Sequence, residues 1–303
     1  MSIEPERKLI LLTGANGQIG FELARTLRSL GHVVALDREG LDLADFEQVR
    51  RIVRELSPAL IVNAAAYTAV DSAESDVVNA MRLNAEAPDI LAQEAKRLGA
   101  LLVHYSTDYV FDGTKDGAYE EGDAANPLNV YGASKLAGEQ AIAASGCAHL
   151  ILRTSWVYGV RGKNFLRTML QLGAQRAELS VVADQIGAPT WSRTIAAITS
   201  EILPQLVVED RDEWLRYSGV YHLTASGATS WCGFAQAIFD MSTLKQKPVV
   251  KAIPTAAYSP YPAAARPRNS RLSNRKLFAT FGLTPPDWRE ALEHCMVDRL
   301  ANP

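Results

Sequence analysis

Short apolar runs alternate with longer amphipathic segments along the first half of the chain. Unbroken apolar runs of this length are typical of strands buried on both faces of a parallel sheet. We expect five of them, at residues 9–12, 33–36, 60–62, 101–103 and 150–152. The segments between them carry helical periodicity, which is clearest at residues 87–98 and 131–144. Parallel strands joined by helices predict an α/β fold with a Rossmann-like, doubly wound parallel sheet.

The second half of the chain is less regular. The expected elements are a helix near residues 165–172, a strand at 179–182, a helix at 192–206, a strand at 220–223, a Pro-rich stretch at 248–267 and a last helix from Trp288. We therefore predict a dinucleotide-binding Rossmann domain made of residues 1–155 plus about 191–224. A smaller C-terminal substrate-binding lobe, made of about residues 156–190 together with residues 225–303, would lie over the carboxyl edge of the sheet, where such folds bind ligands.

Composition narrows the class of protein. The chain has 303 residues, 48% of them hydrophobic, with 31 Lys and Arg against 34 Asp and Glu. This excludes an intrinsically disordered chain and argues against a nucleic-acid partner, which would require a basic excess. No apolar run is long enough for a membrane helix, and residues 1–8 are more typical of a strand entry than of a signal peptide. The three cysteines lie far apart, so we expect no disulfide framework, no zinc site and a cytoplasmic protein.

A glycine-rich turn follows the first expected strand. Gly14, Gly17 and Gly20 have the spacing GxxGxxG and lead into a helix. Glycines at these positions permit a tight turn and let a pyrophosphate approach the backbone N–H groups at the helix N-terminus. Asp37 ends the second strand, where a carboxylate can hydrogen-bond a ribose. The sequence therefore predicts a dinucleotide-binding site.

A second group of residues has the chemistry of a carbonyl reductase. Tyr131 and Lys135 are spaced i, i+4, so they face the same side of a helix, and we expect the lysine ammonium to lower the pKa of the phenol. Such a tyrosine can give a proton to a carbonyl oxygen as a hydride arrives at the carbon. Ser106 and Thr107 follow the fourth strand and can hydrogen-bond the same oxygen. We expect these four residues to be catalytic, with Lys135 also holding the nicotinamide ribose.

The glycine turn, the hydroxyl and the Tyr131–Lys135 pair together resemble the extended branch of the short-chain dehydrogenase/reductase superfamily. A closer resemblance, to the dTDP-4-dehydrorhamnose reductases, extends over nearly the whole chain. It rests on six segments, at residues 62–71 (VNAAAYTAVD), 104–111 (HYSTDYVF), 127–132 (PLNVYG), 153–158 (RTSWVY), 184–190 (DQIGAPT) and 266–272 (RPRNSRL). This series is more specific than the superfamily motifs. It implies reduction of the 4-keto group of dTDP-4-dehydro-L-rhamnose to dTDP-L-rhamnose with NADPH or NADH.

The resemblance also implies which residues form the site. At the pyrophosphate, ribose and adenine these are Gly14, Gly17, Gln18, Ile19, Gly20, Asp37, Arg38, Asp42 and Leu43. Nearer the nicotinamide they are Ala65, Ala66, Tyr67, Thr68, Tyr105, Tyr131 and Lys135. At the dTDP-sugar they are Thr107, Asp108, Trp156, Arg266, Arg268 and Arg271. The three arginines are expected at the diphosphate, because guanidinium groups form bidentate contacts with phosphates.

Metal content and cofactor preference depend on two arginines. Some relatives form dimers through acidic residues that hold magnesium, one of them directly after the Gly-Ala-Pro-Thr segment. Arg193 lies in that stretch here and would repel a cation, so we expect no metal, and either a monomer or a homodimer. Asp37 favours NADH, whereas the adjacent Arg38 favours NADPH. We therefore expect both cofactors to be used, with NADH bound at least as well.

Two alternative functions stay open. One is a sugar-nucleotide epimerase or dehydratase of the same branch, although Tyr109 stands where a dehydratase usually has an acidic residue. The other is a non-catalytic, dinucleotide-binding regulatory subunit of the methionine adenosyltransferase type. Consumption of NAD(P)H on addition of the keto sugar nucleotide would distinguish the reductase from the regulatory subunit.

Overall fold

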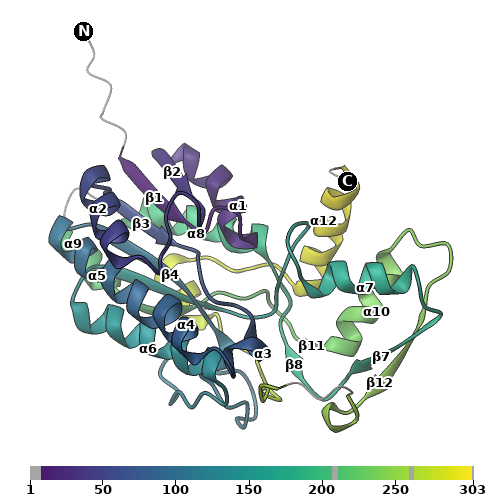
Figure 1. Ribbon diagram of the computed structural model, residues 1–303. Helices are drawn as coiled ribbons and strands as arrows, with labels where there is room; N and C mark the ends of the chain where they lie inside the picture. The colour runs from purple at the N-terminus through teal and green to yellow at the C-terminus, as the bar shows by residue number, and fades with distance from the viewer. Residues whose placement is uncertain (1–7, 207–210, 259–262, 302–303) are drawn as a thin grey trace.

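The computed structural model describes residues 8–206, 211–258 and 263–301, and shows a helix-covered sheet with a smaller lobe beside it (Figure 1). The sheet has six strands, all paired in parallel, in the order β10-β5-β4-β3-β1-β2. They are β1 (Leu9–Thr13), β2 (His32–Leu36), β3 (Leu60–Asn63), β4 (Leu101–Thr107), β5 (His149–Thr154) and β10 (Gly219–His222). The predicted doubly wound α/β fold is confirmed. The strand entry expected at residues 1–7, and residues 259–262 of the Pro-rich stretch, lie outside the described residues.

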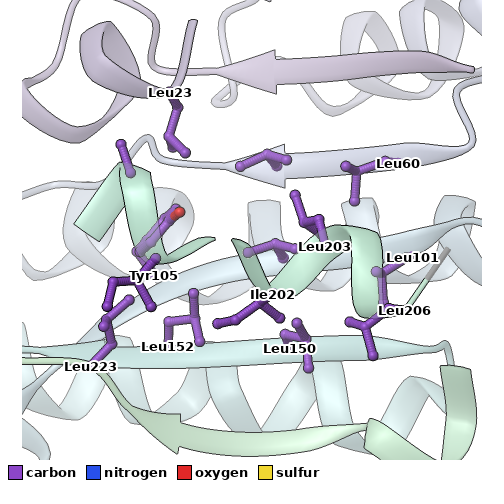
Figure 2. Packing of buried hydrophobic residues seen from close by; sticks show 14 of the residues in the cluster. Leu23, Leu60, Leu101, Tyr105, Leu150, Leu152, Ile202, Leu203, Leu206 and Leu223 are labelled. Carbon is purple, nitrogen blue, oxygen red and sulfur yellow. The ribbon is translucent and has the colours of Figure 1, made fainter. Parts of the chain in front are cut away.

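Successive side chains of the strands enter different cores on the two faces of the sheet. Leu11, Ile61, Leu102 and Ile151 share one core with α2 (Phe46–Leu56), α5 (Ala87–Leu98) and α6 (Val130–Ser145). Their chain neighbours, among them Leu12, Leu60, Leu101, Leu150 and Leu152, share the other core with α1 (Gln18–Thr26) and α8 (Ser192–Leu206). Figure 2 shows the last four of these leucines in that core. Burial on both faces explains why each of these strands contains an unbroken apolar run.

Helix α6 carries two of the expected catalytic residues, and the sequence determines where it begins and ends. The Asn129 side chain accepts a hydrogen bond from the Gly132 N–H and caps the first turn. Gly146 ends the helix in the left-handed conformation, at φ +69°. These two signals place Tyr131 in the first turn of α6 and Lys135 one turn further along.

The lobe is built from short strand pairs and three helices. The pairs are β7 (Glu178–Val182) with β12 (Val249–Ile253), β8 (Ile186–Gly187) with β11 (Thr229–Ser230), and β6 (Val157–Tyr158) with β9 (Thr190–Trp191). The helices α7 (Phe165–Gly173), α10 (Trp231–Met241) and α12 (Trp288–Ala301) enclose a separate apolar cluster. Strand β12 lies within the stretch expected to be only Pro-rich, and α10 was not predicted.

Helix α11 (Arg275–Phe281), also not predicted, does not belong to the lobe's core. Its Leu277 and Phe281 pack in the core that the strands share with α1 and α8, which we call the main core. Our division, which assigns residues 225–303 to the lobe, therefore differs from the packing at α11. The remaining elements are α3 (Val70–Ala73), α4 (Val77–Met81), a π-helical turn (Arg82–Glu86), α9 (Arg211–Tyr217) and three 3-10 turns (Leu27–Ser29, Asp108–Val110 and Thr255–Ala257). In the described part of the chain, no helix is both long and apolar enough to cross a membrane.

Candidate active site

The strand order reverses between β1 and β3, and the glycine turn lies at that point. Ligands of doubly wound sheets bind at the carboxyl ends of the strands where the order reverses. Gly14 follows β1 at φ +69°, and a Cβ there would lie 2.7 Å from the backbone N of Ala65, which follows β3. A Cβ at Gly20 would lie 2.1 Å from the Gly14 carbonyl oxygen. The turn therefore requires glycine at both positions and leaves the N-terminus of α1, at Gln18 and Ile19, beside the β1–β3 junction.

The carboxylate expected at the adenosine ribose is held firmly. Asp37 directly follows β2, and its Oδ1 accepts hydrogen bonds from the N–H groups of Glu39 (3.0 Å) and Gly40 (3.1 Å). Its Oδ2 accepts a hydrogen bond of 2.7 Å from the Asn16 side chain. The Arg38 side chain is 83% exposed, with its Nε 3.9 Å from Asp42. A fixed carboxylate beside the N-terminus of α1 fits a dinucleotide, and Arg38 is placed at its outer rim.

The other residue expected near the adenine, Leu43, is 5% exposed and belongs to the core that contains α2 and α5. Its side chain therefore supports this end of the site from below. Asp42 precedes it, and its Oδ1 accepts a hydrogen bond of 3.0 Å from the Ala44 N–H, so that the carboxylate stabilises the turn leading to α2.

The loop after β3 contains Ala65, Ala66, Tyr67 and Thr68, and a buried asparagine holds it in place. The Asn84 Oδ1 accepts from the Tyr67 N–H at 2.8 Å, and its Nδ2 donates to the Tyr67 carbonyl oxygen at 3.0 Å. The same Nδ2 lies 3.0 Å from Ser134 Oγ on α6. Asn84 belongs to the π-helical turn and was not identified from the sequence, because helical periodicity does not mark a single polar residue on a buried face.

Thr107 and Tyr131 meet at the carboxyl edge of the sheet. Thr107 is the last residue of β4, and Tyr131 lies in the first turn of α6. Burial raises the pKa of Tyr131 to about 12, and a hydrogen bond with Thr107 opposes this shift. Our expectation that Lys135 lowers this pKa was therefore wrong for this arrangement. The phenol is protonated at neutral pH, which is the form that a proton donor requires.

Lys135 is buried below Tyr131, with its amine directed toward β4. Its Nζ donates to the Tyr105 carbonyl oxygen at 2.7 Å and lies 3.0 Å from His104 Nε2. Burial lowers the pKa of Lys135 to about 8, and the Glu139 carboxylate opposes this shift. The Tyr105 ring points away into the core next to α8, where its hydroxyl bonds with Thr199 Oγ1 (Figure 2). Tyr105 therefore reaches the site through its backbone carbonyl, whereas we had expected it to line the nicotinamide.

Two further hydroxyl and carboxyl groups lie beside Thr107. The Ser106 hydroxyl is buried, and it has no hydrogen-bond partner among the residues that the structure describes. Asp108 is 2% exposed and accepts from Thr107 Oγ1 at 3.2 Å. Burial raises its pKa to about 7, while a hydrogen bond from Ser270 opposes the shift. Asp108 is thus a carboxyl group that can change its protonation state near neutral pH.

Trp156 has an unusual backbone conformation and a stacked partner. It is a non-glycine residue at φ +48°, and such outliers cluster at functional sites. Its indole stacks on Trp231 at the start of α10, with ring centroids 3.6 Å apart and planes at 8°. A Cβ at Gly187 would lie 2.5 Å from the Trp156 ring, so this edge requires glycine. Trp231 was missed in the sequence because the two residues are far apart along the chain.

The three arginines expected at the diphosphate differ in their surroundings. The Arg266 guanidinium binds both carboxylate oxygens of Asp71, at 3.0 and 2.7 Å, and is therefore already paired. Arg271 Nε donates to Asn269 Oδ1 at 2.8 Å. Arg268 is exposed. Of the three, Arg268 is thus the most accessible to an anionic ligand.

Arg193, which we expected to repel a cation, is paired with two carboxylates. Its Nη1 and Nη2 each lie 2.9 Å from an oxygen of Asp298 on α12, and its Nε lies 3.2 Å from Glu22 on α1. The guanidinium therefore links α1, α8 and α12. The absence of a metal remains a prediction.

Known proteins resemble this chain over almost its full length. A family model described as the RmlD substrate binding domain matches residues 7–301. A protein of Burkholderia thailandensis is 52% identical, over 96% of this chain and 99% of its own, and one of Escherichia coli K12 is 44% identical, over 95% and 96%. Both are named dTDP-4-dehydrorhamnose reductase. A crystal structure of the reductase from Bacillus anthracis in complex with NADP has a TM-score of 0.89 at 36% identity, covering 96% of this chain and 99% of that one. The chain therefore belongs to the RmlD family, that of the dTDP-4-dehydrorhamnose reductases.

Proposed function

We propose that the chain reduces the 4-keto group of dTDP-4-dehydro-L-rhamnose to dTDP-L-rhamnose, with NADPH or NADH as the reductant. One observation carries the proposal. The protonated phenol of Tyr131 meets Thr107 at the edge of the sheet where the glycine turn lies, with Lys135 buried one turn along α6. The relatives' names support this substrate and favour it over the epimerase and the regulatory subunit.

The residues of the chain perform the proton half of the reaction. The nicotinamide cofactor, when bound, supplies a hydride to the carbonyl carbon. Tyr131 gives its proton to the carbonyl oxygen, and Thr107 orients the oxygen by a hydrogen bond. The phenolate left on Tyr131 then regains a proton from solvent. When Lys135 is charged, it stabilises that phenolate, and the same amino group holds the ribose of the cofactor.

Other residues bind the two nucleotides. Gly14, Gly17 and Gly20 shape the turn for the pyrophosphate, and Asp37 accepts hydrogen bonds from the ribose. Asp108 accepts from a sugar hydroxyl, and Trp156 packs an apolar face against the deoxysugar. Arg268 and Arg271 neutralise the sugar diphosphate. In this scheme the sheet domain holds the cofactor and the lobe holds the sugar nucleotide.

We also propose that the protein acts in the cytoplasm, as a monomer or a homodimer, without a nucleic-acid partner. Its three cysteines are unpaired, which suits a reducing compartment.

Tyr131→Phe tests the proposal, and Tyr109→Phe is its matched control. The Tyr109 ring lies edge-on to Tyr131, with centroids 5.6 Å apart, so the two substitutions each remove one hydroxyl from neighbouring rings. Tyr131→Phe should lower kcat by roughly 10²–10⁴-fold, the usual range for loss of a general acid, and leave cofactor affinity nearly unchanged. Tyr109→Phe should lower kcat far less. Equal losses in the two variants would show that disturbance of the pocket, rather than loss of the proton donor, is responsible.

A further inference from the structure

A chain of buried polar side chains runs from β1 to the lysine of α6. Thr13 Oγ1 donates to Asn63 Oδ1 at 2.7 Å, Asn63 Nδ2 lies 3.1 Å from His104 Nδ1, and His104 Nε2 lies 3.0 Å from Lys135 Nζ. All four residues are at most 1% exposed. Each polar hydrogen of these four side chains must therefore be matched by an acceptor within the protein.

The direction of the hydrogen bonds is set at Asn63. Its Oδ1 accepts from Thr13 and also from the Ala65 backbone N–H, at 3.3 Å. A backbone N–H can only donate, so the amide oxygen must be on that side, and Nδ2 must face His104. Nδ2 is itself a donor. His104 Nδ1 therefore accepts.

The hydrogen of the imidazole consequently lies on the other nitrogen. Burial, together with the nearby Lys135, lowers the pKa of His104 well below its ordinary value, so the ring is neutral and carries one hydrogen. With Nδ1 accepting, that hydrogen is on Nε2 and points at Lys135 Nζ. An ammonium group has no lone pair to receive it, whereas a neutral amine can accept from Nε2–H and still donate to the Tyr105 carbonyl at 2.7 Å.

We propose that His104 is a positioning residue for Lys135: held by Asn63 as the Nε2–H tautomer, it donates to the lysine amine and selects the neutral form of that lysine. To charge Lys135, the hydrogen of His104 must move to Nδ1, where it would face Asn63 Nδ2. Protonation of Lys135 is therefore coupled to the tautomer of His104. The consequence for turnover, though not the tautomer itself, rests on the role proposed above for Lys135.

The other charged groups near the amine do not reverse this conclusion. Glu139 lies one turn along α6 and favours the ammonium, but both of its oxygens are bound by the Arg153 guanidinium of β5, at 2.9 and 2.6 Å. That pair is nearly neutral as a unit. Burial, the largest influence on Lys135, lowers its pKa to about 8 and acts in the same direction as the hydrogen bond from His104.

Nuclear magnetic resonance of the protein labelled with ¹⁵N-histidine, without added cofactor, tests the tautomer directly. Near pH 10, well above the pKa of about 8 for Lys135, the lysine is neutral, and we expect His104 to carry its hydrogen on Nε2 only. His149 is an internal standard, because its Nδ1 lies 2.8 Å from the Cys147 carbonyl oxygen and must carry a hydrogen. The spectrum of His104→Gln assigns the signal. At this pH, a His104 ring with hydrogen on Nδ1, alone or on both nitrogens, would overturn the proposal.

The pH profile of kcat tests the coupling. The charged lysine is the active form, so activity should fall as pH rises through its pKa. Gln has an amide oxygen at about the position of Nε2, where it can accept from an ammonium, so His104→Gln should move this basic limb upward by about one pH unit. His149→Gln should leave the limb in place. An unmoved limb in His104→Gln would refute the coupling, whereas full activity in Tyr131→Phe would refute the proposed function and leave the tautomer untouched.

Discussion

Replacing Asp108 with Asn should stabilise the fold above about pH 7 and weaken binding of the sugar nucleotide. The Asp108 carboxyl is 2% exposed, and burial raises its pKa from 3.8 to about 7. Between these values the unfolded chain has released the proton and the folded chain still holds it, so stability falls as pH rises. Asn has the same shape, accepts from Thr107 through its oxygen, and never carries a charge.

The size of the effect follows from the two pKa values. Each pH unit between them is worth about 1.4 kcal/mol, so keeping the carboxyl buried and ionised costs about 4 kcal/mol above pH 7. Loss of the hydrogen bond from Ser270 would offset about 1 kcal/mol of the gain. We therefore expect Asp108→Asn to raise the free energy of unfolding by about 3 kcal/mol at pH 8 and by much less near pH 4.

Urea denaturation of the wild type and the variant across this pH range is the assay. Asp112→Asn is the control with the opposite sign, because hydrogen bonds from Thr114, Asn126 and Tyr119 hold the pKa of Asp112 below its ordinary value. That variant should be less stable than the wild type at neutral pH. If Asp108→Asn changed the free energy of unfolding equally at pH 4 and pH 8, or destabilised the protein at pH 8, the pKa of Asp108 would not be raised in the folded protein. The KM for the sugar nucleotide should rise in the same variant.

Three further substitutions test the cofactor site and the core. Arg38→Ala should weaken the binding of NADPH by about 1–3 kcal/mol and leave the binding of NADH nearly unchanged in fluorescence titrations, because only NADPH has a 2′-phosphate that can pair with this exposed guanidinium. Equal losses of affinity for the two cofactors would show that Arg38 does not recognise the phosphate. Gly20→Ala should abolish binding of both cofactors in the same titrations, since its Cβ would lie 2.1 Å from the Gly14 oxygen, and normal binding would show that the turn relaxes freely. Leu152→Ala should cost about 2–5 kcal/mol of unfolding free energy in urea, because Leu152 is fully buried in the main core; a loss below 1 kcal/mol would contradict the packing.

The sheet could be predicted because its evidence is local. The strands at residues 9–12, 60–62 and 150–152 are short apolar runs, and they were recognisable without knowledge of their neighbours. The glycine turn and the start of α6 were equally local, since glycine spacing and an asparagine cap act within a few residues. Strand β4 extends further than expected, to Thr107, because the polar residues at its end are also buried.

The features that were missed depend on contacts between distant segments. Trp156 stacks on Trp231, and Arg266 pairs with Asp71, yet no local pattern connects the members of either pair. The pKa of Tyr131 was misjudged for a related reason. Helical spacing brings Lys135 to the same side of α6, but His104 and the Tyr105 carbonyl bind its amine, and burial dominates at the phenol.

In the proposed reaction a hydride passes from the cofactor to the 4-keto carbon of the sugar nucleotide, and Tyr131 supplies the proton. The most direct test is to incubate the protein with dTDP-4-dehydro-L-rhamnose and NADPH carrying deuterium at the transferable position, and to analyse the product by mass spectrometry. We expect dTDP-L-rhamnose with one deuterium at C4, and little of this product when Tyr131→Phe replaces the wild type. Cofactor binding without consumption of NADPH, or a product without deuterium, would contradict it.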